Sequence, residues 1–400
     1  MPLGFIHPTI DSNACVDCEM CVNICPVNHP VKLNEPLKAF SAISRNQDDL
    51  MTSASGGASS VLANVIVGRG GVVYGCVQKN YKDIAHRRID CIEDLYRLKG
   101  SKYVQSDIGY SYNDVKCDLE KGKEVLFTGS PCQIAGLKVF LRKDYERLYL
   151  VDLVCHGVPS QKLLREDVDF LLEDYPNVDK SSVCVEFRHK KRQQEKRFEP
   201  NWGTFIMGGG EIFAHKKKKQ KFLTDNYITA FMAGTIFREN CYTCPYAQRK
   251  RSGDITIADF WGLKGEKVPM TNGVSLLMPS TEKGLRLVNS GKPYLCFEER
   301  PVEEAINGNG QLLHPSPMPK ERKVFVHYYP INPQKAYTLS LREYKHDYHH
   351  QIVRPRIIKQ YEQMVRSNVF LRALNKLPKF KGLVLHCTYA YARFNNIVPE

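Results

Sequence analysis

Apolar segments of strand length alternate with longer amphipathic segments through the middle of the chain. A glycine-led turn opens an expected helix over 55–67, and GVVYGCV (71–77) has the composition of a buried strand. Residues 89–100 carry a helical pattern that Gly100 would terminate. This alternation is typical of α/β domains.

The clearest unit is a strand–helix–strand–helix pattern. Its apolar strands are EVLFTG (124–129) and LYLVDLVC (148–155), and each precedes a helical pattern, at 133–141 and from Ser160 onward. Strands joined through a helix run parallel, so this unit predicts a parallel pair inside a mixed sheet.

Antiparallel pairing is expected farther along the chain. VCVEFRHK, NWGTFIM and EIFAH have strand patterns, and Gly208–Gly210 supplies a hairpin turn between the last two. A helix is expected over 224–237, followed by strands at 254–262 and 274–280.

Taken together, the pattern predicts a mixed α/β (α+β) fold built from several units. These are a cysteine-dense segment (1–30), a polar, irregular connector (31–52), a mixed-sheet domain (53–309), a proline-rich linker (310–335) and a small, basic, helical C-terminal extension (336–400).

The composition is that of a globular protein, since 42% of the 400 residues are hydrophobic and 25% are charged. No apolar stretch is long enough to span a bilayer, and the N-terminus lacks a signal-peptide pattern, so a cytoplasmic location is expected. In a reducing cytosol, 14 cysteines indicate metal or redox chemistry rather than disulfides.

The N-terminal cysteine run has the spacing C-x2-C-x2-C-x3-C-P and consists of Cys15, Cys18, Cys21 and Cys25. This is the bacterial ferredoxin signature, which predicts a [4Fe–4S] cluster; a zinc knuckle normally uses two separated pairs. In two-cluster ferredoxins the fourth cysteine ligates the other cluster, but no second run accompanies this one. Either Cys25 closes a single cluster or an upstream motif is missing.

A second cysteine set is indicated by context and consists of Cys132, Cys155, Cys241 and Cys244. The first two follow the two predicted parallel strands, where ligands of α/β sheets bind. The other two form a C-x2-C-P hook. Four thiolates suit a second [4Fe–4S] cluster or an all-cysteine zinc site, and the hook alone also suits a dithiol redox pair.

Two turns that precede helices are candidate phosphate-binding sites, because helix N-termini present free N–H groups and the positive end of the helix dipole. They contain Ser55, Gly56 and Gly57 in one case and Thr128, Gly129 and Ser130 in the other. Beside iron–sulfur ligands they favour a flavin, which interconverts one-electron and two-electron chemistry.

Over residues 1–290 the chain resembles the beta-subunit family of coenzyme F420 hydrogenases and dehydrogenases, fused to a ferredoxin-type segment. The sequence segments that carry this resemblance are SASGG, GVVYG, LKGSKYVQS (98–106), VLFTGSPCQIAGL, VDLVCHGVPS, CYTCPY and DITIADFWG. The resemblance implies FAD on the two turns and a [4Fe–4S] cluster on the second cysteine set. It also implies an electron path that joins the N-terminal cluster, this cluster, the flavin and a two-electron carrier.

This chain departs from members with a fused ferredoxin segment, which usually carry two cysteine runs. Similar proteins also occur in bacteria that do not make the deazaflavin, so the family name does not fix the substrate. No catalytic residue is singled out by the sequence.

Two basic segments, 188–197 and 215–221, contribute much of the net charge of +14. They are either solvated loops or a docking surface for an acidic ferredoxin, another redox subunit or the poly-glutamate tail of a deazaflavin. Nucleic acid is not expected, since no binding motif accompanies the charge. The tail 368–394 either packs on its own domain or contacts a membrane surface or a partner.

These patterns favour an iron–sulfur flavoprotein oxidoreductase, or the electron-transfer subunit of one. The competing hypothesis is a zinc-bound, non-enzymatic module that holds an acidic partner or polyanion on its basic hairpin.

Overall fold

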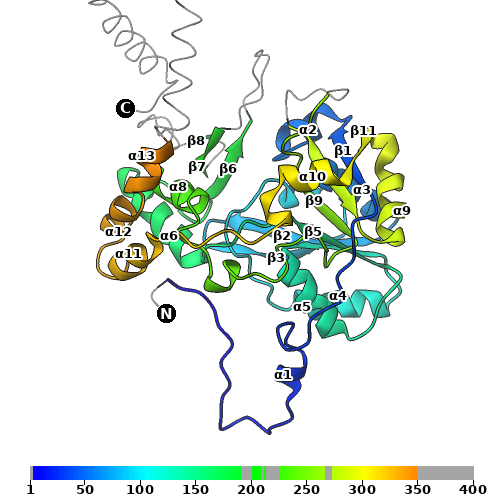
Figure 1. Cartoon of the computed structure of the whole chain (residues 1–400), viewed down its shortest axis with the longest axis horizontal. Helices are drawn as coiled ribbons and strands as arrows, with labels where there is room; N and C mark the ends of the chain where they lie inside the picture. Colours follow the sequence, from blue (N-terminus) through cyan, green and yellow to red (C-terminus); the bar gives the residue numbers. More distant parts are fainter. Residues whose placement is uncertain (1–2, 191–200, 209–210, 213–224, 266–272, 349–400) are drawn as a thin grey trace, which may run out of the picture.

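The computed structural model describes residues 3–190, 201–208, 211–212, 225–265 and 273–348. They form a large sheet covered by helices, the sheet body, and a smaller second lobe at the left of Figure 1. The cysteine-bearing N-terminal segment, with the short helix α1 (Met20–Asn23), passes below both.

Eight strands make the main sheet, in the order β11-β1-β10-β9-β5-β4-β2-β3. They are β1 (Ala39–Ser44), β2 (Val72–Asn80), β3 (Asp83–Ile89), β4 (Val125–Gly129), β5 (Leu148–Leu153), β9 (Ile255–Asp259), β10 (Ser275–Pro279) and β11 (Leu295–Arg300). The strands β2, β4, β5 and β9 are parallel neighbours, and the other pairs are antiparallel. The predicted parallel pair inside a mixed sheet is therefore confirmed.

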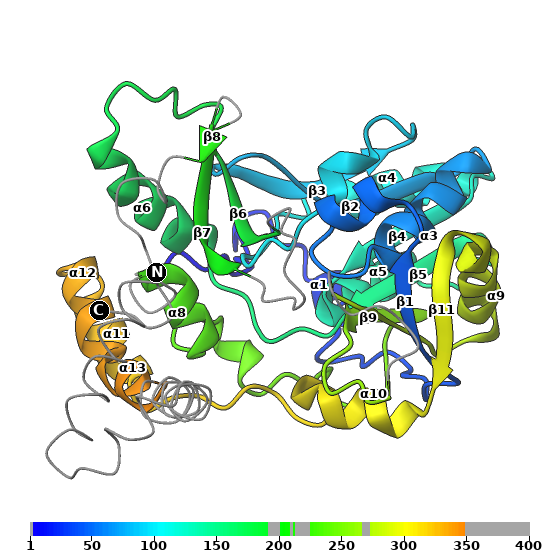
Figure 2. The same ribbon diagram turned by 90° about the horizontal axis from the view of Figure 1, so that it is seen from above.

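Helices cover both faces of the sheet, as Figure 2 shows from above. They are α2 (Gln47–Thr52), α3 (Ala58–Gly68), α4 (Ser111–Glu120), α5 (Pro131–Leu141), α9 (Glu282–Gly291) and α10 (Val302–Gly308), with short 3-10 turns at η1 (Leu95–Leu98), η5 (Lys292–Tyr294) and η6 (Gly310–Leu312). Side chains alternate between the faces: Val125 and Phe127 pack with α4 and α5, whereas Leu126 packs with α3 and α9. The mixed α/β fold class is thus confirmed.

Two sequence-based expectations about this body are wrong. Residues 31–52 are predicted to be irregular, but β1 lies there, fully buried between β10 and β11. Residues 89–100 are predicted to be one helix, but only η1 forms. The exposed Ile92 and Tyr96 give the segment no continuous apolar face to bury.

The second lobe packs helices around a small antiparallel sheet. Its elements are α6 (Gln161–Leu171), η2 (Leu172–Asp174), β6 (Cys184–His189), β7 (Asn201–Gly208), β8 (Glu211–Ile212), α8 (Asn226–Met232), η4 (Glu239–Cys241), α11 (Arg322–Tyr328), α12 (Pro333–Ser340) and α13 (Arg342–Tyr348). The predicted antiparallel pairing of β6, β7 and β8 is confirmed. Helix α11 lies within the expected linker, where the buried Phe325 joins the lobe's core.

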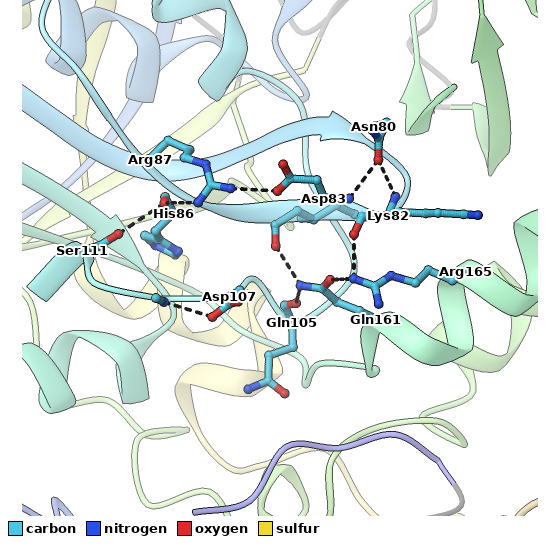
Figure 3. Close-up of polar contacts among 12 residues, drawn as sticks. Asn80, Lys82, Asp83, His86, Arg87, Gln105, Asp107, Ser111, Gln161 and Arg165 are labelled. Carbon is cyan, nitrogen blue, oxygen red and sulfur yellow. Dashed lines mark hydrogen bonds and ion pairs between the residues drawn. The ribbon is translucent and has the colours of Figure 1, made fainter. Parts of the chain in front are cut away.

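The two parts are joined by polar contacts around the β2–β3 hairpin (Figure 3). The Gln161 amide on α6 donates to the carbonyl oxygens of Ile84 (2.7 Å) and Gln105 (3.1 Å). The Arg165 guanidinium donates to the carbonyl oxygen of Lys82 at 2.6 Å. The hairpin therefore fixes α6 relative to the sheet. None of the described helices is long and apolar enough to cross a membrane.

Close packing of α9 on the sheet leads to a stability prediction at Gly284. A Cβ atom there would lie 2.2 Å from the backbone oxygen of Asp254, which cannot move aside easily. We expect Gly284→Ala to lower the free energy of unfolding by about 1–3 kcal/mol in urea titrations. The matched control is Gly68→Ala, because that helical glycine meets nothing within 4 Å. An unchanged urea midpoint for Gly284→Ala would contradict the close approach of Gly284 to the Asp254 backbone.

Candidate iron–sulfur site

The second cysteine set begins at the carboxyl ends of two neighbouring parallel strands. β4 ends at Gly129, and Cys132 is the second residue of α5, which follows directly. β5 ends at Leu153, two residues before Cys155. Because Gly129 pairs in register with Asp152, both cysteines leave the sheet at the same edge.

The C-x2-C hook reaches the same edge from the second lobe. Cys241 ends η4, and the N–H of Arg238 just before this turn donates to the Val158 carbonyl oxygen at 2.9 Å. This contact requires glycine at 157, where φ is +133° and an added Cβ would lie 2.5 Å from the Phe237 ring. The Cys155–Val158 segment and the hook are thereby held side by side.

The four thiols of the second set influence one another electrostatically. Burial, reinforced by the thiolates of Cys132 and Cys241, raises the pKa of Cys155. Burial likewise raises the pKa of Cys241 to about 11, and Cys132 and Cys244 add to that rise. Without metal the thiols of Cys155 and Cys241 are protonated near neutral pH, so metal binding to them would release protons.

The donors of the second cysteine set are all thiols, which suit an iron–sulfur cluster or a zinc ion. Among the described residues, no three Cys, His, Asp or Glu side chains converge tightly enough to hold one metal ion. Zinc requires such convergence, with sulfur about 2.3 Å from the metal. A cubane binds each thiolate to a different iron, and whether this set holds a cluster or a zinc ion stays a prediction.

The N-terminal cysteine run lies on a loop around α1. Asp17 and Glu19 adopt left-handed backbone conformations there, with φ of 49° and 54°. Cys15, Cys18 and Cys21 are exposed, whereas Cys25 is half-buried. Whether Cys25 completes a cluster with these three stays a prediction.

A buried ion pair underlies the second cysteine set. Asp152, on β5, accepts from the guanidinium of Arg251 at 3.0 Å, and both side chains are at most 1% exposed. The Thr256 hydroxyl and the Gly253 N–H also donate to this carboxylate. This pair is not predicted above, although a charged residue inside the apolar strand LYLVDLVC indicates a buried partner.

The Thr128–Ser130 turn is already engaged in hydrogen bonds. The Ser130 N–H donates to the Gln133 side-chain oxygen at 2.9 Å in a capping box. The Gln133 amide reaches Ser106, whose hydroxyl contacts Nδ1 of His86, and Nε2 of that ring contacts the Thr128 carbonyl oxygen at 2.9 Å. Burial lowers the pKa of His86 to about 4, so the ring is neutral at pH 7. A phosphate-binding site at this turn stays a prediction.

The Ser55–Gly57 turn lies at the same sheet edge, beyond β9 and β10. Gly56 approaches the sheet so closely that a Cβ would lie 2.3 Å from the Ala42 carbonyl oxygen. Gly57 has φ of +82° and caps α3. The Ser55 hydroxyl donates to the Val274 carbonyl oxygen at 3.0 Å. The turn is therefore shaped by packing on β1 and β10, and its role toward a flavin stays a prediction.

A groove of about 1590 Å³ runs beside the Ser55–Gly57 turn and is referred to below as the groove. Its lining includes Asp49, Thr52, Ser60, Lys99, Lys102 and Arg188, and the exposed aromatic rings of Tyr96 and Tyr294. The Arg188 guanidinium pairs with Asp259 at 2.6 Å. Asp259 lies two residues past Ile257, which pairs with Leu153, so Asp259 and Cys155 leave the sheet at the same edge.

The predicted basic segments lie largely outside the described residues. Arg188, at the start of the first one, is buried against Asp259 instead of facing solvent. Lys190 donates to the carbonyl oxygens of Leu50 (2.7 Å) and Ser55 (2.6 Å). The remainder of 188–197, the segment 215–221 and the tail 368–394 are not described, so their proposed roles stay predictions.

The fold and site thus define an α/β protein with a thiol-rich ligand set at the carboxyl edge of its parallel strands. Residues 122–305 match the family that is described as the C terminus of the coenzyme F420 hydrogenase/dehydrogenase beta subunit. The match includes the whole second cysteine set. It supports an oxidoreductase role in iron–sulfur electron transfer.

A similar solved structure is described as a xenon derivatization of the F420-reducing [NiFe] hydrogenase complex from Methanosarcina barkeri. The matching chain is 18% identical, and the match covers 76% of this chain and 91% of that one with a TM-score of 0.44. No curated protein matches the sequence.

Proposed function

We propose that this protein is an electron-transfer subunit with two [4Fe–4S] clusters and an FAD. The observation that carries the proposal is the gathering of Cys132, Cys155, Cys241 and Cys244 from two strand ends and one hook. Clusters exchange single electrons and a flavin exchanges one or two, so together they link one-electron and two-electron carriers. The N-terminal cysteine run would hold the other cluster.

The groove is the proposed place for the flavin. Its volume of about 1590 Å³ is large enough for an extended dinucleotide. The rings of Tyr96 and Tyr294 offer stacking surfaces at its rim, and Lys99 and Arg97 lie beside them for phosphates. Its lining residue Arg188 pairs with Asp259, which leaves the sheet at the same edge as Cys155, and this placement favours electron exchange between the flavin and the second cluster.

The two-electron carrier is proposed from the family name, which points to coenzyme F420 or a similar small molecule. The electron donor or acceptor at the other end is proposed to be a protein, an acidic ferredoxin or another subunit. The positive net charge of +14 would favour an acidic partner.

The test is the cofactor content of the full chain prepared without oxygen. We expect a brown protein with about eight iron atoms and a similar amount of sulfide per chain, as two [4Fe–4S] clusters require. Denaturation should release about one FAD per chain. A colourless protein with stoichiometric zinc would instead favour the non-enzymatic, polyanion-binding module. Iron without flavin would reduce the function to an electron relay.

A further inference from the structure

One loop connects the two groups of cysteines. We call residues 244–252 the bracket loop; it starts at Cys244 of the second cysteine set. Within it, the Tyr246 side chain is only 8% exposed, and its hydroxyl is 3.5 Å from the carbonyl oxygen of Pro26. Pro26 follows Cys25 directly, so the Tyr246 ring spans from one group of cysteines to the other.

Arg251 links the bracket loop to the main sheet. Its guanidinium donates to the carbonyl oxygens of Tyr246 (3.2 Å) and Gln248 (3.1 Å) while it pairs with Asp152. Five donors in a rigid, planar fork allow one side chain to hold several acceptors at once. The position of Tyr246 is thus set from the buried sheet.

The backbone of Arg251 also holds the chain that leaves the N-terminal cysteine run. The Asn34 N–H donates to the Arg251 carbonyl oxygen at 2.9 Å, and the Arg251 N–H donates to that of Asn34 at 2.8 Å. Lys138 adds contacts to the carbonyl oxygens of Lys32 (3.3 Å) and Ser252 (3.4 Å). The N-terminal segment is therefore tied to the bracket loop at two points besides Tyr246.

We propose that Tyr246 is a positioning residue that seats the N-terminal cysteine run against the second cysteine set and fixes the distance between them. This inference rests on the proposed function, because the distance between the two groups of cysteines affects electron transfer only when both hold clusters. The ring excludes water between the sets. One electron would leave one cluster and reach the other, with no bond made or broken and no oxidation of the tyrosine.

The first test is electron paramagnetic resonance of the full chain, reduced after anaerobic loading with iron and sulfide. Two reduced clusters held close together broaden each other's signals. We expect this broadening in the wild type and in Tyr246→Phe, which keeps the ring, and its loss in Tyr246→Ala at unchanged iron content. Tyr110→Ala is the matched control, because Tyr110 is 82% exposed. Undiminished broadening in Tyr246→Ala would overturn the proposal.

A second test needs no metal and separates this inference from the proposed function. In the metal-free full chain, trypsin should cleave after Lys32 faster in Tyr246→Ala than in the wild type, Tyr246→Phe or Tyr110→Ala. Equal cleavage rates would show that Tyr246 does not seat the N-terminal segment. A wild-type chain that takes up no iron would defeat the proposed function, and the cleavage rates would still decide the seating.

Discussion

A Cys155→Ser variant is expected to lose about half of the protein's iron and sulfide and to keep the other half. The thiol lies in the middle of the second cysteine set, where burial and neighbouring thiolates act on it together. Serine is a poor ligand for iron, so one corner of the cubane would lack a thiolate and the cluster would be lost from that set. The measurement is iron and sulfide per chain, with the visible spectrum.

Two further variants make this result specific. Cys18→Ser should remove the complementary half of the iron, because Cys18 belongs to the N-terminal cysteine run. Cys117→Ser should change nothing, because this exposed thiol lies on α4 and belongs to neither group. Full iron content in Cys155→Ser, with the wild-type spectrum, would contradict the assignment of the second cysteine set.

The parts of this fold that the sequence predicts well are formed by elements that are neighbours along the chain. β4, α5, β5 and α6 follow one another with short connections, and each has its own local signal, such as the capping box at Ser130. Because β4 and β5 are parallel neighbours, the positions of Cys132 and Cys155 at one sheet edge also follow from the sequence.

Long-range pairing accounts for the elements that the sequence does not predict. β1 pairs with β10 and β11, more than 230 residues away, and nothing local in AFSAIS indicates those partners. The same holds for the bracket loop. Its sequence, CPYAQRKRS, reads as an exposed basic turn, yet Arg251 is 1% exposed because Asp152 lies beneath it. Such a contact depends on tertiary structure and has only an indirect signal, the aspartate inside an apolar strand.

The Arg188–Asp259 pair is a related case. In the sequence, Arg188 begins a run of basic residues that suggests a solvated surface. In the structure it is buried in the wall of the groove, so charge composition alone misplaces it. The guanidinium that lines the groove is therefore already paired with a carboxylate.

Replacing Arg251 by methionine is expected to lower the free energy of unfolding by about 3–5 kcal/mol, because it leaves the Asp152 carboxylate buried without its cation. Asp152→Asn should cost a comparable amount, since it leaves the guanidinium unpaired. Urea unfolding of the metal-free chain measures both. Arg251→Met should also speed trypsin cleavage after Lys32, because the loop that seats the N-terminal segment loses its support.

The exposed pair Arg286–Glu146 provides the matched control for this prediction. Its two side chains are 63% and 80% exposed at a separation of 2.8 Å, so Arg286→Met should change the stability by at most about 1 kcal/mol. The double variant Arg251→Met/Asp152→Asn should recover part of the loss, because neither buried charge remains. Strictly additive losses in the double variant, or equal effects of Arg251→Met and Arg286→Met, would show that the buried pair does not support the bracket loop.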